Sequence, residues 1–196
     1  MAESNNPSKH FSRLYLAIVL IILGFILISA GGKNVQKQLS STFANEPIRL
    51  TGFNFEDNTF ENIPVRIVIP KLKVDLEIAK SEVIAGFWQV FSDKAGWGEG
   101  SGIPGKSGNQ VIFAHAKENL FLPLNNTDLG TRIYIYTKNL SADGNFSAYE
   151  YEVVEIKEVF PNQVETIAPT EDETLTLYTC TGFNDAKRLI VVAKRS

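Results

Sequence analysis

The sequence predicts an all-β domain, either a barrel or a sandwich, that follows an N-terminal membrane anchor. From Pro64 onward, short runs rich in β-branched and aromatic residues are separated by Gly, Pro, Asn and Asp. No long stretch of this region has the 3.6-residue apolar period of an amphipathic helix. After the anchor and a polar spacer, about 135 residues remain, which is enough for one hydrophobic core and too few for two.

Seven or eight strands are expected, one for each β-type run. The runs cover residues 65–69, 74–79, 87–91, 110–114, 130–137, 149–160, 174–179 and 189–193. A glycine-rich loop is expected over 96–108, and one helical turn over 119–124. Short strands at this spacing, joined by turns, are typical of barrels and sandwiches.

The N-terminal region predicts a single membrane span. Residues 1–13 are polar and include Lys9 and Arg13, whereas residues 14–30 form an uncharged apolar run. As a helix, roughly 17 residues extend about 26 Å, close to the thickness of the hydrocarbon layer. Because basic residues precede the run, the N-terminus is expected in the cytoplasm and the domain outside the cell. A cleaved signal peptide is the alternative interpretation.

The expected organisation therefore has four parts. A cytoplasmic N-terminus (1–13) leads into a transmembrane anchor (14–30), an extracellular spacer (31–62) and one folded domain (63–196). The spacer is rich in Asn, Ser, Thr and Gln and lacks sustained periodicity, as is typical of a linker.

The composition excludes several classes of function. The net charge is −3, and no dense Lys/Arg run lies outside the termini, so nucleic acid is not an expected partner. The chain has one Cys and two His, which rules out an internal disulfide. A single Cys with a His elsewhere in the sequence favours a thiol nucleophile over a zinc site.

Cys180 is the candidate nucleophile. A lone cysteine is commonly a small apolar core residue. Here, however, Cys180 ends a β-type run in a polar, turn-rich setting that is a poor place for an inert sulfur and that comprises Thr179, Thr181, Gly182, Asn184 and Asp185. A residue at the end of a strand can project from the edge of a sheet into a cleft.

His115 and Arg188 are the candidate partners of this thiol. His115 follows the apolar run 111–114 and therefore also sits where a strand ends. A lone His beside an apolar run is usually structural, but its placement parallels that of Cys180. Arg188 opens the last β-type run, and strand alternation points Lys187 to the opposite face. A guanidinium beside a thiol can stabilise a thiolate or the oxyanion of a tetrahedral intermediate.

Four segments resemble the sortases, cysteine transpeptidases of bacterial cell surfaces. Thr176-Leu177-Tyr178-Thr179-Cys180 matches the family's Thr-Leu-x-Thr-Cys signature, and 188–191 resembles its arginine-bearing strand. Residues 108–115 resemble the histidine segment, and 69–72 an early strand pair. The resemblance runs from about residue 63 to the C-terminus. Phe113-Ala114-His115-Ala116 replaces the more common Ala-Gly-His pattern, which leaves the class of sortase open.

The resemblance implies a closed eight-stranded barrel with short helical turns. It implies that Cys180 is the nucleophile, His115 the general acid and base, and Arg188 the residue that holds the oxyanion or orients the substrate, with Thr179 helping to position the substrate. The implied substrates are proteins that carry a C-terminal Leu-Pro-x-Thr-Gly-like sorting motif. The implied acceptor is an amine of a cell-wall precursor or of a pilin lysine.

No cofactor is required by this chemistry, although acidic residues make calcium an alternative. They lie at 150, 152, 155 and 158 and at 171–173, and strand alternation accounts for the first set without a metal. Papain-like hydrolases are disfavoured because their Cys precedes their His, and L,D-transpeptidases because they carry Ser-x-Gly-Cys. The remaining alternative is a membrane-tethered, sortase-like barrel that binds without catalysis, in which Cys180 would be buried and inert.

Overall fold

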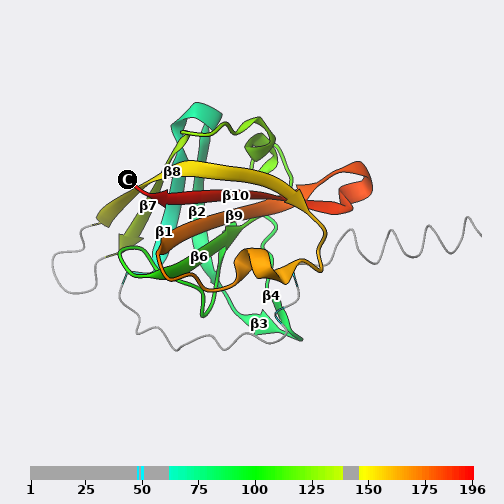
Figure 1. Ribbon diagram of the computed structural model, residues 1–196, viewed down its shortest axis with the longest axis horizontal. Coiled ribbons are helices and arrows are strands. Elements are labelled where there is room, and N and C mark those ends of the chain that lie inside the picture. The colour runs from blue at the N-terminus through cyan, green and yellow to red at the C-terminus, as the bar shows by residue number, and fades with distance from the viewer. Residues whose placement is uncertain (1–47, 49, 51–61, 139–145) are drawn as a thin grey trace, which may run out of the picture. The chain divides into compact units, whose positions relative to one another are not determined.

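Eight strands close into a barrel within the part of the chain that the structure describes (Figure 1). The structure is a computed structural model, and it describes residues 48, 50, 62–138 and 146–196. The barrel strands are β1 (Pro64–Ile69), β2 (Val74–Ser81), β5 (Ala95–Gly98), β6 (Gly108–Phe113), β7 (Arg132–Lys138), β8 (Phe146–Val159), β9 (Glu173–Thr181) and β10 (Lys187–Arg195). A closed barrel was one of the two predicted architectures, and the sandwich is excluded.

The strands follow one another around the barrel in the order β1-β2-β5-β6-β9-β10-β8-β7, and β7 closes the ring by pairing with β1. The pairs β2–β5 and β6–β9 are parallel, and the other neighbours are antiparallel. The β6–β9 pair joins segments that lie about 65 residues apart in the chain. Figure 1 shows β6, β9 and β10 side by side in the barrel wall.

Short elements connect these strands. They are a hairpin of β3 (Val83–Ile84) with β4 (Phe87–Trp88), and the 3-10 helices η1 (Pro70–Leu72), η2 (Leu122–Asn126), η3 (Val164–Ile167) and η4 (Phe183–Asp185). The strand predicted over 87–91 is thus wrong in extent, because β4 ends at Trp88 and pairs only with β3. The helical turn predicted over 119–124 begins three residues later, where Pro123 suits the first turn of a helix.

The loop predicted over 96–108 is wrong at its start, because residues 96–98 belong to a barrel strand, β5. Glycine is required there by close packing. A Cβ on Gly98 would lie 2.4 Å from the indole of Trp88, and a Cβ on Gly96 would lie 2.2 Å from the hydroxyl of Ser81. A strand whose alternate positions are glycines has no apolar and polar alternation, so the sequence pattern does not reveal it.

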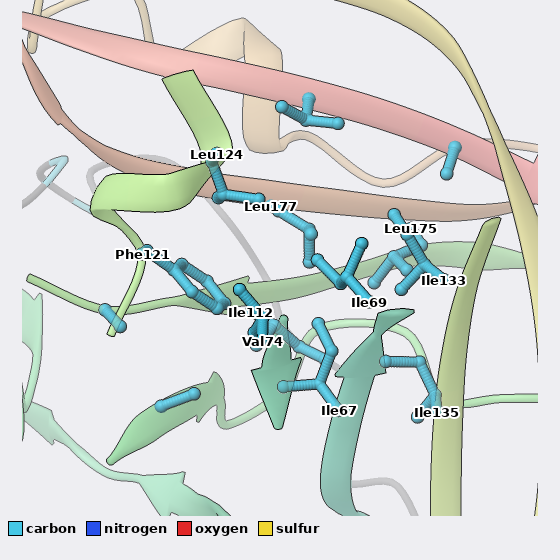
Figure 2. Close-up of a cluster of buried hydrophobic side chains, with 14 of the residues drawn as sticks. Ile67, Ile69, Val74, Ile112, Phe121, Leu124, Ile133, Ile135, Leu175 and Leu177 are labelled. Carbon is cyan, nitrogen blue, oxygen red and sulfur yellow. The ribbon is translucent and has the colours of Figure 1, made fainter. Parts of the chain in front are cut away.

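Apolar side chains cover both faces of the wall formed by β6, β9 and β10. Leu175 and Leu177 of β9 point into the barrel, where they meet Ile112 of β6 and Ile69 of β1 (Figure 2). The alternate residues of the same strands form a second cluster on the outer face: Val111, Phe113, Tyr178 and Ile190, covered by Ile48, Trp88, Val159 and Ile167. Burial on both faces explains why the runs of β6 and β10 are almost continuously apolar, whereas β9 alternates Leu and Tyr with buried Thr.

The predicted anchor (14–30) and the residues before it lie outside the described part of the chain, as does nearly all of the spacer (31–62). No helix among the described residues is both long and apolar enough to cross a membrane.

Candidate active site

The pairing of β6, β9 and β10 brings the three predicted functional residues to the same end of the barrel wall. Arg188 lies directly opposite Cys180 in the antiparallel β9–β10 register. In the parallel β6–β9 register, Phe113 lies opposite Tyr178, and the next amide, that of Ala114, donates to the Tyr178 carbonyl at 3.4 Å. His115 therefore leaves β6 at the level at which Cys180 stands on β9.

Cys180 lies on the outer face of the barrel wall. It follows Tyr178 by two residues on β9, and Tyr178 belongs to the outer cluster, so strand alternation gives both residues the same face. Its side chain is half-buried, and β9 runs one residue past it, to Thr181. Burial raises the pKa of the thiol above its ordinary value; the Arg188 guanidinium lowers it, and the Asp185 carboxylate raises it. At neutral pH the resting sulfur is thus a thiol.

Backbone hydrogen bonds to the His115 carbonyl fix the position of this residue. Its carbonyl accepts hydrogen bonds from the amides of Lys117 (2.9 Å) and Phe121 (3.1 Å), which folds the chain into a compact turn after β6. Burial lowers the pKa of the imidazole, and the Lys117 ammonium lowers it further, while the Asp185 carboxylate raises it. A neutral imidazole beside a neutral thiol is the state in which His115 can accept a proton.

Arg188 is 1% exposed, which makes it one of the largest fully buried side chains among the described residues. Its Nη1 donates to the carbonyls of Asp185 (2.9 Å) and Lys187 (2.8 Å). Asp185 belongs to the short β9–β10 turn, in which Asn184 and Asp185 both have positive φ, 52° and 56°, and Lys187 is the first residue of β10. The buried guanidinium therefore holds a strained turn as well as facing the thiol. Lys187, which alternation points to the opposite face, pairs instead with Glu158.

Thr179 connects the two strands that carry His115 and Cys180. Its hydroxyl donates to the carbonyl of Ala114 at 2.8 Å, and its side chain is 1% exposed. The predicted contact of Thr179 with a substrate stays a prediction. The contact that the structure contains is internal, and it fixes the chain at Ala114, which follows β6 and precedes His115.

Two residues near Cys180 were not predicted to have a role in this site. The Asp185 carboxylate acts on the pKa of both His115 and Cys180. Tyr178 occupies the variable position of the signature, and it shares the face of Cys180 and stacks on Phe113. Strand alternation alone would have found Tyr178. Asp185 gives no such signal, because its place depends on the path of the turn.

The acidic residues that raised the alternative of calcium are largely paired with basic side chains. Glu150 meets Arg132 at 3.0 Å, and Glu158 meets Lys187 at 2.8 Å. In the described part of the chain, no three His, Cys, Asp or Glu side chains gather closely enough to hold a metal ion.

The chain is similar to known proteins over the region that contains this site. The family model described as "Sortase domain" matches residues 67–196. Sortase A of Streptococcus agalactiae serotype III (strain NEM316) is 31% identical over 143 residues, covering 68% of this chain and 53% of that protein. Sortase A of Bacillus anthracis is 30% identical over 135 residues, covering 65% and 57%. The chain thus spans little more than half the length of these curated relatives.

Solved structures show the same barrel. One of them is Clostridium perfringens sortase C with the C-terminal cell wall sorting motif, which aligns with a TM-score of 0.55 at 23% identity, covering 71% of this chain and 74% of that one. This likeness supports the fold. The match to the family model covers most of the chain and includes His115, Cys180 and Arg188, so the family predicted from the sequence is confirmed: this chain belongs to the sortase family.

Proposed function

We propose that this protein is a membrane-anchored cysteine transpeptidase that cleaves a C-terminal sorting motif and transfers the cleaved protein to an amine. The observation that carries this proposal is the register of three neighbouring strands. In this register, Arg188 lies opposite Cys180 on β10. On the other side of β9, β6 ends just before His115, at the level of Cys180. Membership of the sortase family supports the reaction class.

In the proposed reaction, His115 first accepts the proton of the Cys180 thiol. The lowered pKa of the imidazole and the raised pKa of the thiol make both groups neutral at rest, so the proton moves as the sulfur attacks. The sulfur bonds to the scissile carbonyl carbon and a tetrahedral intermediate forms. Its C–N bond then breaks, and His115 returns the proton to the leaving amine.

The acyl group is then a thioester on Cys180. An incoming amine gives a proton to His115 and attacks the thioester carbonyl, after which the C–S bond breaks and the sulfur regains a proton. Because the thioester retains the energy of the cleaved peptide bond, the transfer needs no ATP. The proposed role of Arg188 is to stabilise the oxyanion of the tetrahedral intermediate or to orient the substrate. Its buried guanidinium, on the strand position opposite Cys180, supports that role.

The proposed substrates are proteins with a Leu-Pro-x-Thr-Gly-like C-terminal motif, and Thr179 is assigned to substrate positioning. The proposed acceptor is an amine of a cell-wall precursor or of a pilin lysine. A structural neighbour, Clostridium perfringens sortase C, has been solved with its C-terminal cell wall sorting motif. The proposed location is the outer side of a cell membrane, with residues 14–30 as the anchor and no cofactor required. The uncharged apolar run supports the anchor.

The test is acyl transfer from a sorting-motif peptide to an amine. We expect Cys180→Ala to abolish the transfer, and His115→Ala or Arg188→Ala to reduce it by at least roughly 10²-fold. The folded wild-type domain should also react with iodoacetamide at Cys180. If the Cys180→Ala protein transfers at the wild-type rate, the mechanism is wrong. If the thiol reacts only after denaturation, the protein is a non-catalytic binding domain.

A further inference from the structure

The β3–β4 hairpin extends away from the barrel and ends in an apolar tip (Figure 1). Residues 83–87 read Val-Ile-Ala-Gly-Phe, and none of them carries a polar side chain. Val83 is 45% exposed and Ile84 57%. These two residues follow one another on β3, so their side chains point to opposite sides of the hairpin. Both sides of the tip are therefore open.

The turn at the tip is apolar as well. Ile84 pairs with Phe87, which leaves a two-residue turn of Ala85 and Gly86, and both have positive φ, 53° and 84°. Turns of this kind usually place Asn or Asp before the Gly, because these residues tolerate positive φ and their side chains form hydrogen bonds. Alanine is strained in this conformation and offers water no hydrogen bond. The composition of the turn thus favours an apolar surrounding over water.

Behind the tip, the hairpin becomes polar. Glu82 and Gln89 are both exposed, and the amide of Gln89 donates to the carbonyl of Glu82 at 2.9 Å. From Val83 to the turn, a strand extends roughly 7 Å at about 3.4 Å per residue. Segments that lie on a membrane bury their apolar face to a similar depth, roughly 5–10 Å. The dimensions of the tip therefore fit the interface of a lipid bilayer.

The base of the hairpin is fixed to the face of the barrel that carries Cys180. Trp88 is 1% exposed, and its Nε1 donates to the carbonyl of Glu99 at 3.1 Å. Its ring stacks on Phe113 with centroids 5.7 Å apart, and Phe113 stacks on Tyr178 at 4.9 Å. Tyr178 shares its face of β9 with Cys180. A surface that holds the tip therefore also sets the orientation of the face with the nucleophile.

The chain arrives at this hairpin from the predicted anchor. The amide of Leu50 donates to the carbonyl of Gly86 at 2.9 Å, and Ile48 is fully buried in the outer cluster together with Trp88. Only 19 residues, 31–49, separate the apolar run from Leu50. Even when fully extended, a chain of that length spans about 65 Å at most. The hairpin is thus the part of the domain at which the membrane tether ends, and lipid is an apolar surface within its reach.

We propose that the tip of the β3–β4 hairpin inserts into the interface of the membrane that anchors the chain, and so orients the face carrying Cys180 relative to the lipid. The partner is a lipid surface: Val83 and Ile84 meet the acyl chains, and Glu82 and Gln89 remain among the hydrated headgroups. This inference rests on the membrane location in the proposed function. It adds a second membrane contact to residues 14–30.

The test measures contact between the tip and lipid in the full-length protein. The Ile84→Trp variant is reconstituted into phosphatidylcholine vesicles whose acyl chains carry bromine, a quencher of indole fluorescence, with unbrominated vesicles as the reference. We expect the new indole to show a blue-shifted emission that is lost in the brominated vesicles. Trp88 and Trp97 are 1% and 2% exposed and contribute the same background in every variant.

Leu129→Trp is the matched control. Leu129 is 67% exposed, and it follows Asp128, which pairs with Lys71 of η1. Since η1 precedes β2 and the hairpin follows it, the control residue lies at the other end of β2 from the tip. Its emission should be the same in both kinds of vesicle. Equal quenching of the two variants would overturn the inference.

The outcomes separate this inference from the proposed location. If the full chain floats with the vesicles but Ile84→Trp is not quenched, the hairpin inference is wrong and the membrane location stands. A blue shift without quenching would mean that another protein surface covers the tip, and it would overturn the inference too. If the full chain does not float with the vesicles, the membrane location fails together with the inference.

Activity tests the role of the tip in orientation. Ile84→Asp places a charge where lipid is expected. It should slow transfer from a sorting-motif peptide that a palmitoyl chain holds in the same vesicles, and leave transfer from the soluble peptide unchanged. Leu129→Asp should change neither rate. Wild-type rates with both peptides in Ile84→Asp would refute the orienting role. If the wild-type protein transfers neither peptide, the proposed reaction fails, and quenching still decides whether the tip meets lipid.

Discussion

Replacing Thr179 by Val should lower the stability of the barrel and the rate of acyl transfer. Thr179 links β9, which carries Cys180, to the segment between β6 and His115. Its hydroxyl donates to the Ala114 carbonyl at 2.8 Å, and both residues are buried. Valine has nearly the same shape, so the substitution removes the donor without creating a cavity. Thr179→Ser, which keeps the hydroxyl, is the matched control.

The magnitude follows from the burial of this hydrogen bond. A substitution that leaves a buried carbonyl without its hydrogen-bond donor lowers the free energy of unfolding by about 1–3 kcal/mol. For a domain of this size, about 1 kcal/mol corresponds to a shift in melting temperature of about 2–4 °C. A loss of about 2 kcal/mol therefore predicts a fall of about 4–8 °C. Thr179→Ser should retain most of the stability, since its hydroxyl can make the same bond.

Kinetics of acyl transfer separate the two roles assigned to Thr179. If the residue acts by holding the end of β6, kcat falls in Thr179→Val while KM changes little, because the geometry of proton transfer is disturbed. If the hydroxyl instead contacts the substrate, KM rises and the melting temperature stays the same. A Thr179→Val protein with wild-type stability and wild-type kcat would refute the reasoning.

Two further predictions concern charge and metal. The Asp185 carboxylate raises the pKa of both His115 and Cys180, because its negative charge favours the imidazolium and disfavours the thiolate. Asp185→Asn should therefore lower both pKa values and move the pH profile of kcat/KM to lower pH. Asn tolerates the positive φ at this position and Asp185→Glu keeps the charge, so a profile that moves equally in both variants would contradict the electrostatic reason. Chelation with EDTA should leave acyl transfer unchanged, because the proposed chemistry uses only side chains. Loss of transfer, with recovery on adding calcium, would show that the enzyme needs the metal.

The sequence by itself determined the all-β class, and it singled out the three residues to which the proposed mechanism assigns its steps. Alternation of apolar and polar residues is a local property of a strand, so it can be recognised in the sequence without knowledge of the fold. It placed Cys180 and Arg188 at strand ends and pointed Lys187 away from Arg188, and the signature around Cys180 identified the family. Alternation did not predict β5, because two of its four residues are glycines without side chains. These glycines make room for Trp88 and Ser81.

Only the tertiary structure decided which strands are neighbours and what lies over the outer face of the wall. The parallel pairing of β6 with β9 joins residues far apart in the chain, and it alone sets His115 at the level of Cys180. The same pairing sets Phe113 opposite Tyr178, so that their rings stack, and the Asp185 carboxylate of the β9–β10 turn raises the pKa of both His115 and Cys180. These features depend on long-range packing and on the burial of charged groups, which no local periodicity encodes.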